Sequence, residues 1–133
     1  MAKLTLSPDA AKISGLWFVT VYVDDFAKAV EFYGDILALE KSHQPEPDAC
    51  FFAIGANQHG LFLQGGARAK TTKPEDSHAS FVLTVESASA LFQRLKLNGV
   101  KVVQEEPIDR GEGDFWFQFH DPANNLLEVF GGK

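Results

Sequence analysis

One carboxylate stands out in the last apolar run of the chain, "NLLEVFGG" at residues 125–132. The leucine, valine and phenylalanine residues of this run predict a buried strand. A buried carboxylate without a partner costs several kcal/mol, so Glu128 needs a cation, hydrogen-bond donors or a bound molecule beside it. A carboxylate in apolar surroundings is also suited to exchange a proton or to bind a metal. Glu128 is therefore the candidate catalytic residue.

The histidines and the single cysteine offer few partners for a metal site. The sequence contains no HxH, HExxH or CxxC spacing. His78 lies two residues before Ser80, so in a strand both side chains point to one face, where His78 could join Glu128 as a second ligand. The competing interpretation places His78 in a solvated loop, because it follows the polar stretch "PEDS".

The composition is that of one ordinary globular domain. The 133 residues are 45% hydrophobic and 23% charged, with one cysteine, and no apolar segment near the N-terminus resembles a signal or a membrane span. The net charge of -6 disfavours nonspecific binding to nucleic acid or anionic membranes and favours a cationic ligand. We therefore expect a single domain over residues 1–133, a cytoplasmic location, and neither a nucleic acid nor a membrane as partner.

The elements that position Glu128 occur twice along the chain. "HGLFLQGG" (59–66) matches "NLLEVFGG", and "FVTVYVDDFAKAVEFYGDILAL" (18–39) matches "SFVLTVESASALFQRLKLNGV" (80–100). Each copy begins with an alternating strand pattern and continues with apolar residues at helical spacing. Three short apolar runs follow in each copy, at about 39–44, 49–54 and 60–64, and at about 100–104, 115–119 and 126–130. The pattern predicts two βαβββ modules, about 13–66 and about 78–131, joined by a linker at about 67–77.

The chain resembles the vicinal oxygen chelate superfamily of glyoxalases, bleomycin resistance proteins and extradiol dioxygenases. Three features carry the resemblance: the duplication, the segment "VYVDDFAKAVEFYGDILAL" (21–39) and the segment "FHDPANNLLEVF" (119–130). The resemblance implies an α+β fold in which the two modules form a cupped mixed sheet around a central cavity, with the helices on the outside. It also implies a homodimer. Asn124 replaces a glycine that is frequent in this superfamily, and we expect the turn to survive because asparagine tolerates a positive φ.

The resemblance further implies four inward positions that carry metal ligands in metal-dependent members, and in this sequence they are Phe18, Phe62, Ser80 and Glu128. Phenylalanine cannot ligate a cation through a lone pair, and a serine hydroxyl is a poor ligand for Zn, Ni or Fe. We therefore predict that the protein uses no cofactor. The alternative is a divalent metal such as Zn or Ni, held by His78 and Glu128.

Strand alternation predicts an aromatic cavity with a few polar groups, which suits a small organic molecule. It does not decide which face of the run 115–119 lines that cavity. The predicted ligand-binding residues are Phe18, Thr20, Tyr22, Phe62, Gln64, His78, Ser80, Trp116, Glu128 and Phe130.

From this lining we predict a metal-free small-molecule-binding protein of the glyoxalase/bleomycin-resistance type, with an aromatic or cationic ligand. Two alternatives stay open. The first is a glyoxalase-like metal-dependent lyase or isomerase, or a dioxygenase, that uses Glu128 as ligand or base. The second is a noncatalytic interaction domain with a filled cavity. Whether the protein is an enzyme is therefore left open by the sequence.

Overall fold

The computed structural model describes residues 16–55, 59–66 and 79–133. In the first half, a strand leads into a helix that continues as a π-helix, and three strands follow: β1 (Phe18–Tyr22), α1 (Phe26–Glu31), η1 (Phe32–Ile36), β2 (Glu40–Glu46), β3 (Ala49–Ala53) and β4 (Gly60–Gln64). The second half repeats this order with an ordinary helix: β5 (Ala79–Ser87), α2 (Ala88–Leu97), β6 (Ile108–Gly111), β7 (Asp114–His120) and β8 (Leu126–Gly132). The predicted α+β class is thereby confirmed.

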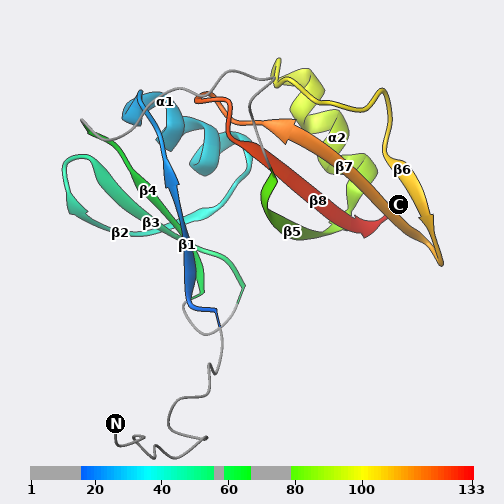
Figure 1. Ribbon diagram of the computed structural model, residues 1–133, viewed down its shortest axis with the longest axis horizontal. Coiled ribbons are helices and arrows are strands. Elements are labelled where there is room, and N and C mark those ends of the chain that lie inside the picture. The colour runs from blue at the N-terminus through cyan, green and yellow to red at the C-terminus, as the bar shows by residue number, and fades with distance from the viewer. Residues whose placement is uncertain (1–15, 56–58, 67–78) are drawn as a thin grey trace, which may run out of the picture.

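The strands form two mixed four-stranded sheets that stand side by side (Figure 1). Sheet A has the order β1-β4-β3-β2 and sheet B has the order β5-β8-β7-β6, with a parallel pair at one edge of each. Within the described residues no strand of one sheet pairs with a strand of the other. Among the described strands, the edge strands β1 and β5 consequently have a hydrogen-bonded neighbour on one side only.

The helices begin where the sequence places good capping residues. Asp25 Oδ1 accepts a hydrogen bond from the backbone N–H of Lys28 at 3.1 Å, and Ser87 Oγ accepts one from Ala90 at 3.1 Å. Helix α2 covers one face of sheet B and α1 lies across sheet A (Figure 1). The strand residues on that face are fully buried, including Leu61, Leu63, Phe117 and Val129. The opposite face of each sheet is therefore left for a site.

One predicted strand is wrong. Residues 100–104 do not form a strand, because only Val102 makes a bridge, to Phe119 of β7. The edge of sheet B is instead occupied by β6, which is not among the predicted strands. Positive φ angles at Gly111, Glu112 and Gly113 form the tight turn that folds β6 back against β7.

A buried hydrogen bond joins the two halves. Tyr33 and Asp121 are 0% and 3% exposed, and the Tyr33 hydroxyl donates to Asp121 Oδ2 at 2.8 Å. Asn125 Nδ2 adds a second link by donating to the backbone oxygen of Tyr22 at 3.0 Å. In the turn from Asp121 to Asn125, Asn124 has φ of 63°, as expected for an asparagine at a position that favours glycine. The turn after β7 thus fixes the second half to the first.

None of the helices in the described residues is long and apolar enough to cross a membrane.

Candidate functional site

Strand register decides which face of β7 lies on the same side of sheet B as Glu128. Gln118 of β7 and Val82 of β5 lie directly opposite Glu128 of β8, and Trp116 lies opposite Phe130. Residues opposite each other in a sheet share a face, so Trp116 and Gln118 are on the side of Glu128. The other face of β7 carries Phe117 and Phe119, which are fully buried in the core.

Glu128 is half-buried and is held from one side. Trp116 Nε1 donates a hydrogen bond to Glu128 Oε1 at 2.8 Å, and Gln118 Nε2 lies 3.5 Å from the same oxygen. Among the described residues nothing donates to the second oxygen, Oε2. One carboxylate oxygen is therefore fixed by the protein while the other is available to a proton, a cation or a ligand.

Gln104 orients the amide group of Gln118. Gln104 Nε2 donates to Gln118 Oε1 at 3.0 Å, and Gln104 Oε1 accepts from the backbone N–H of Gln118 at 2.7 Å. Because the oxygen end of the Gln118 amide is occupied by Gln104, its nitrogen end points toward Glu128. Neither glutamine was predicted from the sequence, since Gln104 lies outside any regular element and each face of β7 carries at least one large aromatic residue.

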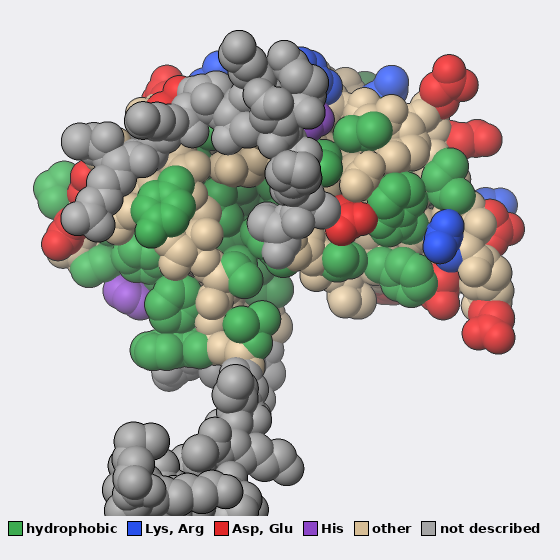
Figure 2. Space-filling view, viewed as in Figure 1, with side chains coloured by type: hydrophobic (Ala, Val, Ile, Leu, Met, Phe, Trp, Pro, Cys, Tyr) green, Lys and Arg blue, Asp and Glu red, His purple; other side chains and the backbone are tan. Residues whose placement is uncertain are grey.

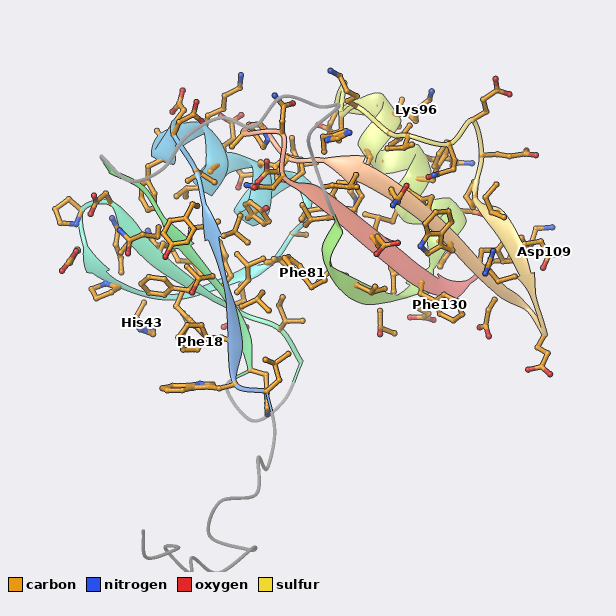
Figure 3. The ribbon with its side chains drawn as sticks, in the orientation of Figure 1. Phe18, His43, Phe81, Lys96, Asp109 and Phe130 are labelled. Carbon is orange, nitrogen blue, oxygen red and sulfur yellow. The ribbon has the colours of Figure 1, made fainter. Side chains whose placement is uncertain are left out.

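The predicted residues of the first half form a separate aromatic group on sheet A. Phe18 packs against Phe51 and Phe62, with ring centroids 5.7 Å and 5.9 Å away, and His43 stacks on Phe51 at 5.3 Å. Figure 3 shows Phe18 and His43 on the same side of sheet A, while Phe130 extends from sheet B. Thr20, Phe62, Tyr22 and Gln64 follow in register on the same pair of strands.

The described contacts therefore give two groups rather than one closed cavity. No hydrogen bond or ring contact between described residues joins the aromatic group of sheet A to Trp116, Glu128 or Phe130. His78 lies outside the described residues, and Ser80 is described only by its backbone, in β5. Hydrophobic side chains gather on the exposed side of both sheets (Figure 2), where Tyr22 is 49% and Val82 is 54% exposed.

The described residues do not by themselves fit a metal centre. Within residues 16–55, 59–66 and 79–133, no three histidine, cysteine, aspartate or glutamate side chains are placed to hold a metal ion. Phe18 and Phe62 supply no donor atom, and Oε1 of Glu128 already accepts from Trp116. On this face Glu128 is the candidate ligand of β8, and strand alternation places Asp114 and His120 of β7 on the same side.

Comparisons with known proteins identify the family and include a relative whose structure contains a metal. The sequence model of the Glyoxalase/Bleomycin resistance protein/Dioxygenase superfamily matches residues 15–129. The fosfomycin resistance protein FosX of Listeria monocytogenes is 28% identical over 126 residues, which cover 90% of this chain and 91% of that protein. The structure of Listeria monocytogenes FosX complexed with Mn(II) and sulfate superposes with a TM-score of 0.71 at 25% identity, covering 92% of this chain and 93% of that one.

Lactoylglutathione lyase of Agrobacterium tumefaciens shares the fold, with a TM-score of 0.66 at 19% identity over 90% of this chain and 95% of that one.

The prediction that no cofactor is used is wrong in the light of this comparison, because a FosX structure contains Mn(II). The prediction counted donor atoms at four repeat-related positions of one chain. Divalent metals also take ligands from other positions and from water, so the loss of three donors at those positions does not exclude a metal.

Proposed function

Because the chain belongs to the glyoxalase/bleomycin resistance protein/dioxygenase superfamily, we propose that it is a small-molecule enzyme in which Glu128 either binds a divalent metal or accepts a proton from the substrate. The reaction is of the lyase, isomerase or dioxygenase type found in such a superfamily. This replaces the metal-free binding protein as the preferred function.

The observation that carries the proposal is the geometry of Glu128. Its Oε1 is fixed at 2.8 Å from Trp116 Nε1, and its Oε2 has no donor among the described residues. A carboxylate held in place with one oxygen available is the arrangement that a general base or a metal ligand requires. A filled, noncatalytic sheet face gives no reason for such a group.

Without a bound metal, the surroundings of Glu128 favour a neutral or cationic small molecule. Val82 and Phe130 are exposed apolar side chains on this face, and Trp116 offers an aromatic surface. None of the described residues whose register places them on this face is a lysine or arginine. An aromatic or cationic substrate that packs on Trp116 and Phe130 would bring its reacting atom to Oε2.

For the metal, Mn(II) is the first candidate, by comparison with the Mn(II) complex of FosX. Glu128 is one candidate ligand, and His78, which lies outside the described residues, is the second. The described residues do not complete a metal centre, so binding of Mn(II) by this chain is a prediction that a metal titration must test.

We expect metal-stripped protein to bind one equivalent of Mn(II) in isothermal titration, with a Kd in about the micromolar range. Zn(II) and Ni(II) are titrated in parallel, and each metal-loaded sample is assayed with fosfomycin and with methylglyoxal plus glutathione. Turnover that depends on Mn(II) would support the metal-dependent form of the proposal. No binding of any of the three metals, together with turnover in metal-free buffer, would leave Glu128 as a base. The absence of both metal binding and turnover would contradict the proposal.

The active assembly is proposed to be a homodimer in which sheet A of one chain faces sheet B of its partner. Three features support this. The aromatic group of Phe18 and the Glu128 group lie on separate sheets; β1 and β5 are open edge strands; and Tyr22 and Val82 are about half exposed. A second copy of the chain would cover these apolar side chains and bring the two groups to one cavity.

Replacing Val82 with glutamate is expected to convert the dimer to a monomer, because a charge would be buried against the apolar partner face. Leu97→Glu is the matched control, since Leu97 is 88% exposed on α2, away from both open sheet faces. Light scattering coupled to size exclusion measures the mass of each protein. A wild-type protein that runs as a monomer at micromolar concentration would refute the dimer.

A further inference from the structure

One backbone N–H sets the direction of two side-chain amides beside Glu128. The N–H of Gln118 can only donate, so the Gln104 atom that lies 2.7 Å away is the oxygen of the amide, Oε1. Gln104 Nε2 then lies at the other end of that amide and donates to Gln118 Oε1 at 3.0 Å. Turning either amide around would place two donors or two acceptors opposite each other. The nitrogen of the Gln118 amide is consequently directed toward Glu128.

The segment that contains Gln104 is fixed along the edge of β7. Val102 forms a bridge to Phe119, and the N–H of Val103 donates to the backbone oxygen of Gln118 at 2.9 Å. A purely structural role for Gln104 would require only an acceptor for the N–H of Gln118, which a glutamate supplies as well as a glutamine. The hydrogen bond from Gln104 Nε2 to Gln118 Oε1 goes beyond that role, because it fixes the direction of the second amide.

Trp116 and Gln118 give the face of Glu128 two N–H groups. Trp116 Nε1 and Gln118 Nε2 lie 2.8 Å and 3.5 Å from the same oxygen, Glu128 Oε1. The indole has one N–H hydrogen, which this oxygen accepts, whereas the amide nitrogen has two. The long contact with Oε1 uses one of these two, and no acceptor among the described residues takes the other. An available N–H donor therefore lies beside the carboxylate whose Oε2 is also available.

We propose that Gln104 is a positioning residue for the site at Glu128, and that it holds the Gln118 amide so that Nε2 donates a hydrogen bond to an oxygen of the substrate. The proposal rests on the function proposed for Glu128 and narrows its substrate to molecules with an acceptor oxygen, such as carbonyl compounds. An aromatic carbonyl compound fits this face, because its ring can pack on Trp116 while its oxygen accepts from Gln118.

Gln104→Glu tests the direction of the amide. The new carboxylate still accepts from the backbone N–H of Gln118 but cannot donate to Gln118 Oε1, so the amide is expected to turn its oxygen toward Glu128. In the wild type the indole and amide hydrogens that point at one oxygen lie within about 5 Å of each other. Nuclear magnetic resonance should therefore show an Overhauser effect between Trp116 and the Gln118 amide in the wild type, and Gln104→Glu should lose it.

Gln93→Glu is the matched control, because it introduces the same charge at an exposed position of α2, on the side of sheet B that faces away from Glu128. This variant should keep the Overhauser effect. The chain has two tryptophans, so the indole signal of Trp116 is identified by its absence from Trp116→Phe. An Overhauser effect that is absent from the wild type, or that persists in Gln104→Glu, overturns the positioning role.

Acetophenone and ethylbenzene test the role of Gln118 as a donor, since the two molecules have similar shapes and only acetophenone has an acceptor oxygen. In titrations of metal-free protein, acetophenone is expected to shift the side-chain amide signals of Gln118 with a Kd of about 1 mM or tighter. Ethylbenzene is expected to bind at least about fivefold more weakly, because it accepts no hydrogen bond. Absence of acetophenone binding, or equal binding of both molecules, overturns the proposal.

Two variants should lose the preference for acetophenone. Gln104→Glu turns the donor away, and Gln118→Met removes it while keeping a side chain of similar volume and the backbone hydrogen bond to Gln104. Gln93→Glu should retain the full preference. A preference that is unchanged in Gln118→Met, or reduced equally in Gln93→Glu, overturns the proposal.

These measurements require neither a metal nor turnover, so they separate this proposal from the function proposed for Glu128. A protein that passes them without turning over any substrate would contradict the proposed enzyme and leave the donor role of Gln118 in place. An active enzyme that fails them would contradict the role of Gln104 and Gln118 alone.

Discussion

Replacing Asp121 with alanine is expected to destabilise the protein by about 3 kcal/mol, which corresponds to an unfolding temperature about 10 °C lower. Asp121 accepts hydrogen bonds from the Tyr33 hydroxyl at 2.8 Å, from the backbone N–H of Ala123 at 2.9 Å, and from Asn125 through both its backbone and its side chain. Alanine would leave the buried tyrosine hydroxyl without an acceptor and the turn without its organising carboxylate.

Asp109→Ala is the matched control for this loss. Asp109 also accepts a hydrogen bond from a nearby backbone N–H, that of Gly111 at 2.8 Å, but it is exposed on β6. Its replacement is expected to change the free energy of unfolding by about 0.5 kcal/mol or less. Thermal and urea unfolding measure both variants. If Asp121→Ala were no more destabilised than Asp109→Ala, the Tyr33 contact would contribute little to stability.

The same residue gives the stability a pH dependence. Burial raises the pKa of Asp121, although the hydrogen bonds from Asn125 and Tyr33 act in the opposite direction. The folded protein therefore holds a proton on Asp121 more tightly than the unfolded chain does. The resulting stabilisation is complete below the ordinary aspartate pKa of about 3.9 and is lost as the pH rises through the raised pKa.

In Asp121→Asn the contribution of this protonation to the free energy of unfolding disappears. The difference in unfolding free energy between wild type and Asp121→Asn should therefore be largest at the acid end and should decline as the pH rises. A difference that grew with pH would mean that the hydrogen bonds outweigh burial in setting the pKa. At the alkaline end, burial and the neighbouring Asp121 raise the pKa of Tyr33 well above its usual value, so ionisation of this tyrosine also favours unfolding.

The second large effect is expected at Glu128. Glu128→Gln keeps the shape of the side chain but replaces one carboxylate oxygen with an N–H donor and removes the negative charge. We expect the variant to lose about 100-fold or more in Mn(II) affinity if Glu128 is a ligand, or in kcat/KM if it is a base. Isothermal titration and turnover assays separate the two cases, because a base can be lost without any change in metal affinity.

Glu86→Gln is the control for the change in charge. Glu86 is exposed on β5 in the same sheet. Its replacement is expected to leave the Mn(II) affinity and kcat/KM within about twofold of wild type. The unfolding temperature of Glu128→Gln should remain close to that of wild type, since amide and carboxylate are of equal size. A Glu128→Gln variant that retained wild-type metal affinity and turnover would exclude Glu128 from the active group.

The fold could be predicted from the sequence because its local signals agree with each other. Alternating residues in β1 and β5, capping by Asp25 and Ser87, and the repeated order of runs all indicate the same unit. The segment 100–104 was misassigned because an apolar run of this length does not distinguish a strand from a chain that crosses a sheet edge. Strand β6 was missed because its pairing depends on the turn at Gly111–Gly113, which the sequence equally allows as a loop.

The site was less predictable than the fold. Glu128 stands out in the sequence because it is a charge in an apolar run, but its partners depend on strand register. Trp116 and Gln118 reach Glu128 through the pairing of β7 with β8, and that pairing places Gln118 opposite Glu128. Since Phe115, Phe117 and Phe119 lie on one face of β7 and Trp116 lies on the other, the presence of aromatic residues did not select the face that lines a site. A metal such as the Mn(II) of the FosX structure could not be anticipated either, because donor counting within a repeat ignores ligands from outside it.

The contact between Tyr33 and Asp121 also constrains the order in which the protein can be completed. The two residues are 88 positions apart, so the ribosome finishes the helical segment with Tyr33 long before the acceptor of its hydroxyl exists. Until residue 121 is made, the Tyr33 hydroxyl lacks the carboxylate that accepts its hydrogen bond in the folded protein. The core around Tyr33 thus gains its last polar contact only when the turn that leads into the strand of Glu128 is available.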